Sequence, residues 1–162
     1  MIRRLLVIAF VSAGLAGCGD AAPRGATESA ARLLAAAAKG DRVAFEAEID
    51  RPAVRDDVRR QMSEVARSRV LDVEGGPSEF ALDRMIGPDA VHLVRAGSSQ
   101  ALTTAPGVDQ IAGQMKAIDG NRACLADARA PDRCLLTFAR AKGGWRLVGM
   151  QASDLRIEVS GD

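Results

Sequence analysis

Apolar residues in the first half of the chain recur every three or four positions, which is the spacing of helices that bury one face. Four runs follow this pattern, at residues 27–40, 41–49, 50–65 and 78–87. Each run opens with a side chain whose oxygen accepts a backbone hydrogen bond, as an N-cap does: Thr27, Asp41, Asp50 and Ser78. We therefore expect four helices. The outer face of the third carries charges of both signs, and we interpret it as a solvated surface, with a basic interaction face as the alternative.

Two later stretches have weaker patterns. Residues 91–94 are apolar enough for a last helical turn or for a strand, and we favour the helical turn. In residues 108–118 the apolar positions, Met115 and Ile118 among them, share one helical face, so we expect a helix there as well. Gly113 in the middle of this helix costs about 1 kcal/mol relative to alanine.

Short apolar runs replace the helical spacing in the last quarter of the chain. Three of them, at residues 123–126, 134–139 and 145–150, are separated by turn-rich stretches. This pattern predicts an antiparallel meander of two hairpins, and we expect residues 155–159 to extend the sheet. Helices first and a small antiparallel sheet last define an α+β fold, which we expect to occupy residues 27–162 as a single domain.

The first 18 residues have the order of a bacterial secretion signal. Two arginines come first, then an apolar run of 12 residues, and then the sequence Leu15-Ala16-Gly17-Cys18. Because a helix needs roughly 20 apolar residues to span the bilayer core, we expect an export signal and not a transmembrane helix. An ordinary signal peptide cleaved nearby, with Cys18 as an incidental thiol, is the alternative interpretation.

The tetrad that ends the apolar run resembles the lipobox of bacterial lipoproteins. In that motif the cysteine thiol takes a diacylglyceryl group, and the signal is cut before the cysteine. The resemblance implies that residues 1–17 are a removed signal peptide, that Cys18 carries the lipid, and that residues 18–26 form a flexible tether. The protein would then be held to a membrane by its N-terminal lipid. Gly19 stands where an aspartate favours the inner membrane, so we expect the periplasmic face of the outer membrane.

Composition limits the remaining possibilities. Without residues 1–17 the chain has 145 residues, which is the size of one domain, and it carries 20 basic and 21 acidic residues. A chain this close to neutrality has no electrostatic footprint for nucleic acid. Its four aromatic residues include no tyrosine, and we expect them to serve the core.

Two further cysteines, Cys124 and Cys134, lie in consecutive predicted strands. A turn centred near Arg129 would set them opposite each other, within reach of a disulfide. Exported domains form such bonds, and closing a loop of about ten residues stabilises a fold by roughly 2.5 to 3 kcal/mol. A redox-active pair is the alternative, but its thiols usually lie two residues apart, whereas nine residues separate these. We therefore expect a structural disulfide.

The sequence contains no motif for catalysis, a metal or a cofactor. His92 is the only histidine, and no Gly-x-Ser-x-Gly elbow accompanies it, so we interpret it as structural. A zinc site needs three or four cysteine, histidine or carboxylate ligands, which one histidine and a bridged cysteine pair do not supply. Gly75-Gly76 lacks the lysine and the preceding strand of a phosphate-binding loop. We expect neither enzyme activity nor a cofactor.

Part of the chain resembles a known family. The segments that carry the similarity are Lys39-Gly40-Asp41, Ile49-Asp50, Ala53-Val54-Arg55, Met85-Ile86-Gly87-Pro88-Asp89-Ala90 and Gly144-Trp145-Arg146-Leu147. They look like the bacterial envelope family DUF2939, over about half of the chain that follows Cys18. Arg51 stands where members often carry an aromatic residue, and the lipobox and the disulfide are departures. The resemblance implies an envelope protein of this architecture and provides no catalytic residue.

Together these patterns predict a non-enzymatic module of the cell envelope, with a structural role or a protein partner there. The alternative is a small-ligand binder similar to the NTF2-like fold, in which helices cover a curved sheet. Its pocket would need roughly 300 Å³ or more. The expected lining is Phe80, Met85, Met115, Phe138 and Trp145. A hydrolase built around His92 is a third hypothesis.

Overall fold

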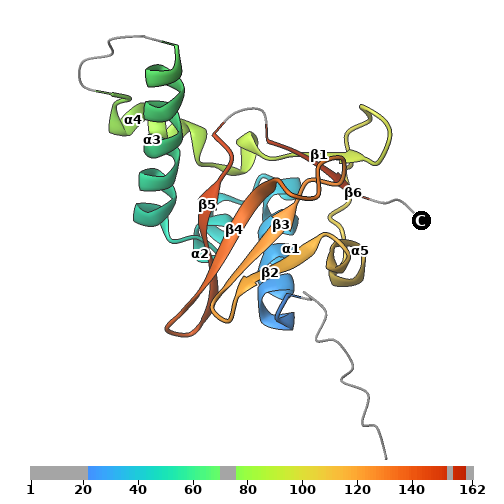
Figure 1. Ribbon diagram of the computed structural model, residues 1–162. Coiled ribbons are helices and arrows are strands. Elements are labelled where there is room, and N and C mark those ends of the chain that lie inside the picture. The colour runs from blue at the N-terminus through green and yellow to red at the C-terminus, as the bar shows by residue number, and fades with distance from the viewer. Residues whose placement is uncertain (1–21, 70–75, 153–154, 160–162) are drawn as a thin grey trace, which may run out of the picture.

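The computed structural model describes residues 22–69, 76–152 and 155–159 (Figure 1). The predicted signal peptide, Cys18 and the beginning of the predicted tether lie outside the described residues. In chain order the elements are α1 (Arg24–Lys39), α2 (Arg42–Ala47), α3 (Arg51–Ser68), α4 (Glu79–Met85), the 3₁₀ turn η1 (Pro88–Ala90), β1 (His92–Arg95), α5 (Val108–Ala112), β2 (Met115–Asp119), β3 (Arg122–Ala126), β4 (Cys134–Ala141), β5 (Gly144–Met150) and β6 (Arg156–Val159). The predicted α+β fold class is confirmed.

Three of the four predicted N-caps are present. The carboxylates of Asp41 and Asp50 accept the backbone N–H of the third residue of α2 and of α3, and the Ser78 hydroxyl does the same for α4, at 3.0 to 3.2 Å. The prediction for Thr27 is wrong, because α1 already begins at Arg24, after Pro23, and Thr27 is buried inside the helix. α1 therefore includes the last three residues of the predicted tether.

A four-stranded antiparallel sheet in the order β2-β3-β4-β5 contains the predicted meander. α1 lies behind this sheet in Figure 1 and packs on β4 and β5, while α3 runs along β5. The core between α1 and the sheet contains side chains that are completely buried: Leu33, Leu34, Leu125, Leu136, Phe138 and Leu147. α3 packs on β5 through Val54 and Val58, and α4 is held against α3.

The helix predicted over residues 108–118 is wrong in its second half. α5 ends at Ala112, and the chain turns into β2 at Met115. Met115 is 3% exposed and pairs with Leu125, whereas Ile118 is 45% exposed. The two residues therefore do not share a buried face, because pairing with β3 replaces the helical spacing by the alternation of a strand.

The expectations for residues 91–94 and 155–159 are also corrected. Residues 92–95 form β1, and β6 pairs with it in parallel as a separate two-stranded sheet instead of extending the meander. Leu93 of β1 faces Ile157 of β6 in this register, and both are buried. A parallel pair between strands this far apart in sequence leaves no local turn signal, which is why the pattern did not reveal it.

The predicted disulfide between Cys124 and Cys134 is present, with the two Cα atoms 5.6 Å apart. The predicted register is wrong, since Cys124 lies opposite Thr137 and Cys134 lies opposite Ala126. An irregularity in the pairing between β3 and β4 places Leu135 as an additional residue on β4. The two cysteines are therefore bridged diagonally and not as directly opposed residues.

Candidate functional site

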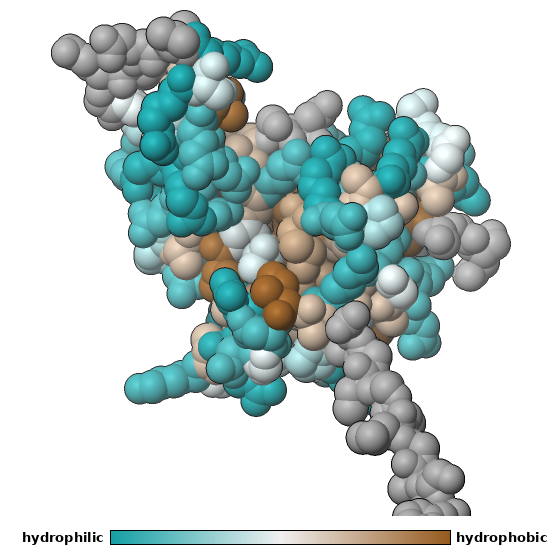
Figure 2. Space-filling view, viewed as in Figure 1, coloured by the Kyte–Doolittle hydropathy of each residue, from teal (hydrophilic) through white to brown (hydrophobic). Residues whose placement is uncertain are grey.

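An open groove of about 800 Å³ lies between the C-terminal half of α3, the end of α4 and the residues that follow β5. Figure 2 shows apolar surface between the hydrophilic outer side of α3 and the sheet. The residues that give the groove its mostly apolar lining are Met62, Val65, Ala66, Met85 and Ala152. Val65 is half exposed, which is unusual for a valine on a helix that packs against a core.

Gln61 fixes the floor of the groove. Its side-chain amide donates to the carbonyl oxygen of Met150 at 2.9 Å and to the carboxylate of Asp57 at 2.7 Å, and its Oε1 accepts the N–H of Ala152 at 3.0 Å. These hydrogen bonds connect α3 to the end of β5. Both polar atoms of the Gln61 amide take part in them. The apolar side chains of α3 beyond Gln61 are left facing the groove.

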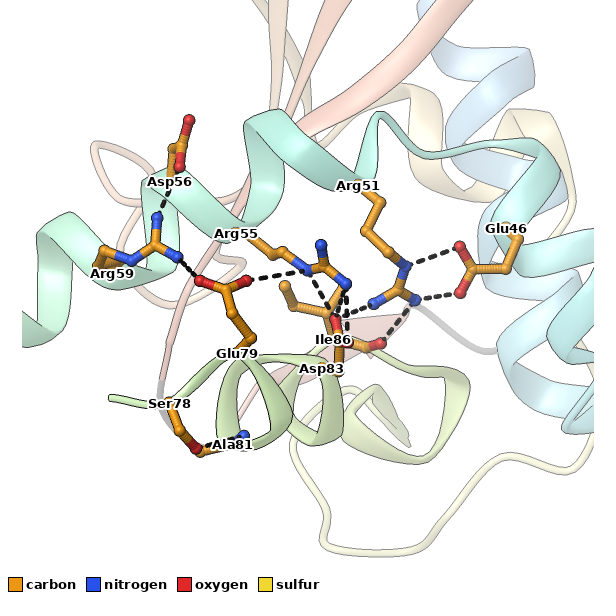
Figure 3. A network of polar contacts seen from close by, with 10 residues as sticks. All are labelled: Glu46, Arg51, Arg55, Asp56, Arg59, Ser78, Glu79, Ala81, Asp83 and Ile86. Atoms are coloured by element: carbon orange, nitrogen blue, oxygen red, sulfur yellow. Dashed lines mark hydrogen bonds and ion pairs between the residues drawn. The ribbon is translucent and has the colours of Figure 1, made fainter. Parts of the chain in front are cut away.

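A ladder of arginines holds α4 against α3 (Figure 3). Arg51, Arg55 and Arg59 follow one another at four-residue spacing on α3, so their side chains lie on one face. Arg55 and Arg51 both donate to the carboxylate of Asp83, and Arg59 pairs with Glu79. The interpretation of the outer face of α3 as solvated is therefore corrected for Arg55 and Arg59, whose charges are used between two helices, whereas Asp56, Arg60, Glu64, Arg67 and Arg69 are exposed.

The ladder shifts the pKa values of Asp83 and Arg51. The hydrogen bond and charge of Arg55, followed by those of Arg51, hold the pKa of Asp83 below its usual value of 3.8. The hydrogen bonds that Arg51 donates to the carboxylate of Glu46 similarly raise the pKa of Arg51. Both shifts favour the charged forms of Asp83 and Arg51, and the contact between α3 and α4 contains ion pairs.

The structure does not gather the five residues predicted to line a pocket, and that prediction is corrected. Met115, Phe138 and Trp145 are buried in the core, with exposures of 3%, 0% and 7%. Phe80 is instead 71% exposed on α4, where the guanidinium of Arg84 lies over its ring. Of the five, Met85 lines the groove.

Sequence reasoning overlooked the groove, although one signal pointed to it. The apolar stripe of α3 continues through Met62 and Val65 after Val58, which is the last fully buried residue of that helix. An apolar stripe that continues past the buried core indicates a helix face that can contact a binding partner. Nothing in the local pattern showed that residues 151–152 would form the opposite wall.

His92 lies on β1 with its side chain exposed, and its backbone N–H donates to the carbonyl oxygen of Leu155 at 2.9 Å. Among the described residues, no group of three or more histidine, cysteine or acidic side chains is placed to hold a metal ion. None of the helices in the described ranges is long and apolar enough to span a bilayer.

No family model matches the chain, and no curated protein or solved structure matches it either. The similarity to the DUF2939 envelope family therefore stays an interpretation of the sequence segments that carry it.

Proposed function

We propose that the protein is a lipid-anchored, non-enzymatic module of the bacterial cell envelope that binds a partner protein in the groove between α3, α4 and residues 151–152. The groove carries the proposal, because it offers about 800 Å³ of mostly apolar space beside a half-exposed helix face. The export signal and the lipobox at Cys18 support the location, together with the resemblance to an envelope family.

The start of α1 and the groove lie at opposite ends of β5, which suits a domain anchored at its N-terminus that binds a partner in the groove. α1 begins against the first part of β5, where a Cβ atom on Gly25 would come within 2.9 Å of Cδ1 of Trp145. The groove lies past the other end of the same strand, at Gln151 and Ala152. β5 has seven residues and so spans about 20 Å at roughly 3.3 Å per residue. An anchor attached before α1 would therefore join the domain at the opposite end of β5 from the groove.

The shape of the groove favours a protein segment over a small molecule. Sites for small ligands usually enclose most of the ligand surface, whereas this groove is open along its length. On α3, Met62, Val65 and Ala66 stand at the i, i+3 and i+4 positions that a partner helix contacts. The alternative, a small-ligand binder, retains one supporting observation, namely a volume above roughly 300 Å³.

Site-specific photocrosslinking in living cells tests the proposal. A photoreactive residue at Val65 should yield a defined crosslinked protein, and the same residue at Val43 should not. Val43 is a suitable control because it is 82% exposed and lies on α2, outside the groove. The partner identified in this way is then purified, and its affinity is measured for Val65→Asp and Val43→Asp.

We expect Val65→Asp to weaken binding of the purified partner at least tenfold, because a charge would be buried in an apolar contact. Val43→Asp should leave the affinity unchanged. Equal crosslinking at both positions, or equal affinity of both variants, would remove the groove from the proposal. A small molecule that co-purifies with the wild type and is lost in Val65→Asp would favour the ligand-binding alternative.

A further inference from the structure

A polar hollow of about 330 Å³ lies where the loop between β3 and β4 faces β6. The disulfide between Cys124 and Cys134 closes this loop. In Figure 2 hydrophilic side chains gather over β1 and β6, in contrast to the apolar surface over the middle of the sheet. The charged residues that line the hollow are Asp127, Arg129, Arg133, Arg156 and Glu158.

Two carboxylates form the base of the hollow and hold two of its arginines. Asp127 and Glu158 are only 7% and 8% exposed. Asp127 pairs with Arg133 and accepts the backbone N–H of Arg129 at 2.8 Å, while Glu158 pairs with the Arg129 guanidinium. Burial raises the pKa of Asp127, but the hydrogen bonds from Arg133 and from the Arg129 N–H outweigh it and hold that pKa below its usual value.

The arginines keep hydrogen-bonding capacity that these pairs do not use. A guanidinium has five N–H donors, and both Arg129 and Arg133 reach their carboxylates through Nη2. Their side chains are 68% and 55% exposed, so the other donors stay accessible from the hollow. Arg156 is exposed and makes no ion pair with a described residue. Among the described residues that line the hollow, three guanidiniums stand against two carboxylates, which leaves one positive charge.

We propose that this hollow binds a phosphate group. Buried acids hold Arg129 and Arg133 in place, so little conformational freedom is lost when they bind an anion. Three arginines from two segments suit a phosphate, which presents three or four oxygens in different directions, better than a planar carboxylate with two. The phosphate is either free or part of a phospholipid headgroup, and both sources present the same group to the arginines. Gln151 borders both this hollow and the groove, but the phosphate site does not depend on the proposed function.

Titration calorimetry on the full-length protein, purified from membranes in detergent, tests the proposal with inorganic phosphate as the probe. Sodium chloride at the same ionic strength is the blank for nonspecific screening. We expect saturable binding to the wild type and a loss of at least about tenfold in affinity for Arg156→Gln, as is typical when a charged hydrogen bond is removed. Arg156 is exposed, so this variant should keep the melting temperature of the wild type.

Arg122→Gln is the matched control, because Arg122 is also an exposed arginine on a strand but lies at the far end of β3 and pairs with Asp119. Absence of phosphate binding to the wild type overturns the proposal, as does an equal loss in Arg122→Gln and Arg156→Gln. Glycerol 3-phosphate, the polar part of a phospholipid, distinguishes the two sources. Tighter binding than inorganic phosphate identifies a headgroup, and equal or weaker binding identifies free phosphate.

Discussion

Arg55 of α3 and Asp83 of α4 form a two-pronged ion pair, with Nε and Nη2 of the guanidinium each 2.7 Å from one oxygen of the carboxylate. Leu82 is the only buried residue of α4. The short helix that supplies Met85 to the groove is therefore held by one buried leucine and by ion pairs. Its position should depend on the ionisation of Asp83 and on the salt concentration, because partly exposed pairs are screened by ions.

Replacement of Asp83 by asparagine should loosen α4 without unfolding the protein. The variant keeps the shape of the side chain but loses the charge that Arg51 and Arg55 share. We expect amide hydrogen exchange in residues 79–86 to become several-fold faster, while exchange in the sheet stays as it is. Asp56→Asn is the control, because Asp56 pairs only within α3. Unchanged exchange in α4 would show that Leu82 is sufficient to hold it.

Acid should loosen the attachment of α4 to α3, because it protonates Asp83. The pKa of Asp83 in the folded protein lies below its usual value of 3.8. Its ionised form therefore stabilises the folded protein, and this stabilisation is fully present above pH 3.8. The stabilisation from Asp83 is lost as the pH falls from 3.8 through the lowered pKa of the folded protein. Amide NMR signals of α4 should therefore stay constant from neutral pH down to about pH 5 and move below about pH 4. In Asp83→Asn this step should disappear, and its persistence would assign the step to another carboxylate.

Two glycines should respond to alanine in opposite ways. A Cβ atom at Gly25 would lie 2.9 Å from Cδ1 and 3.2 Å from Nε1 of Trp145, a rigid ring in the core. We expect Gly25→Ala to lower the free energy of unfolding by about 1 to 3 kcal/mol through overpacking. Gly113 has open space around it and a φ of −66°, so Gly113→Ala should raise that free energy by up to about 1 kcal/mol. Chemical denaturation measures both, and equal effects would contradict the packing at Trp145.

Local interactions decided which parts of the fold could be predicted from the sequence. Helix starts at Asp41, Asp50 and Ser78 were predictable, because an N-cap is a local interaction between residues three apart. The meander was predictable because turn residues separate its apolar runs. Met115 and Ile118 misled the prediction, since residues three apart match a helix even where pairing with β3 makes a strand.

The candidate site was harder to predict, because it is made by contacts between distant segments. Arg55 and Asp83 are 28 residues apart, and Gln61 bonds to Met150 across 89 residues. The ligand-binding alternative assigned Phe138 and Trp145 to a pocket from residue type alone, whereas both are buried, as expected of core residues. A sequence pattern shows which residues prefer burial but not which of them the fold leaves at a groove.

The disulfide should contribute to stability through the unfolded state. It joins residues ten apart in sequence, and the chain-entropy model gives about 2.5 to 3 kcal/mol for a loop of that size. The double variant Cys124→Ala/Cys134→Ala should lose about this much free energy of unfolding in urea. Reduction of the wild type should produce a similar loss, and should leave the double variant unaffected. A much smaller loss in both experiments would mean that the loop is already ordered in the unfolded chain.

The predicted lipid anchor is tested by the intact mass of the protein extracted from membranes, first unreduced and then reduced and alkylated. We expect a mass that begins at Cys18 and carries acyl chains, since the residues before it match an export signal and a lipobox. Alkylation should add two groups, at Cys124 and Cys134, only after reduction. Cys18→Ser should instead keep its signal peptide and gain no acyl mass. A processed wild-type chain without acyl groups would rule out the lipoprotein prediction, and the groove would then belong to a protein released into the periplasm.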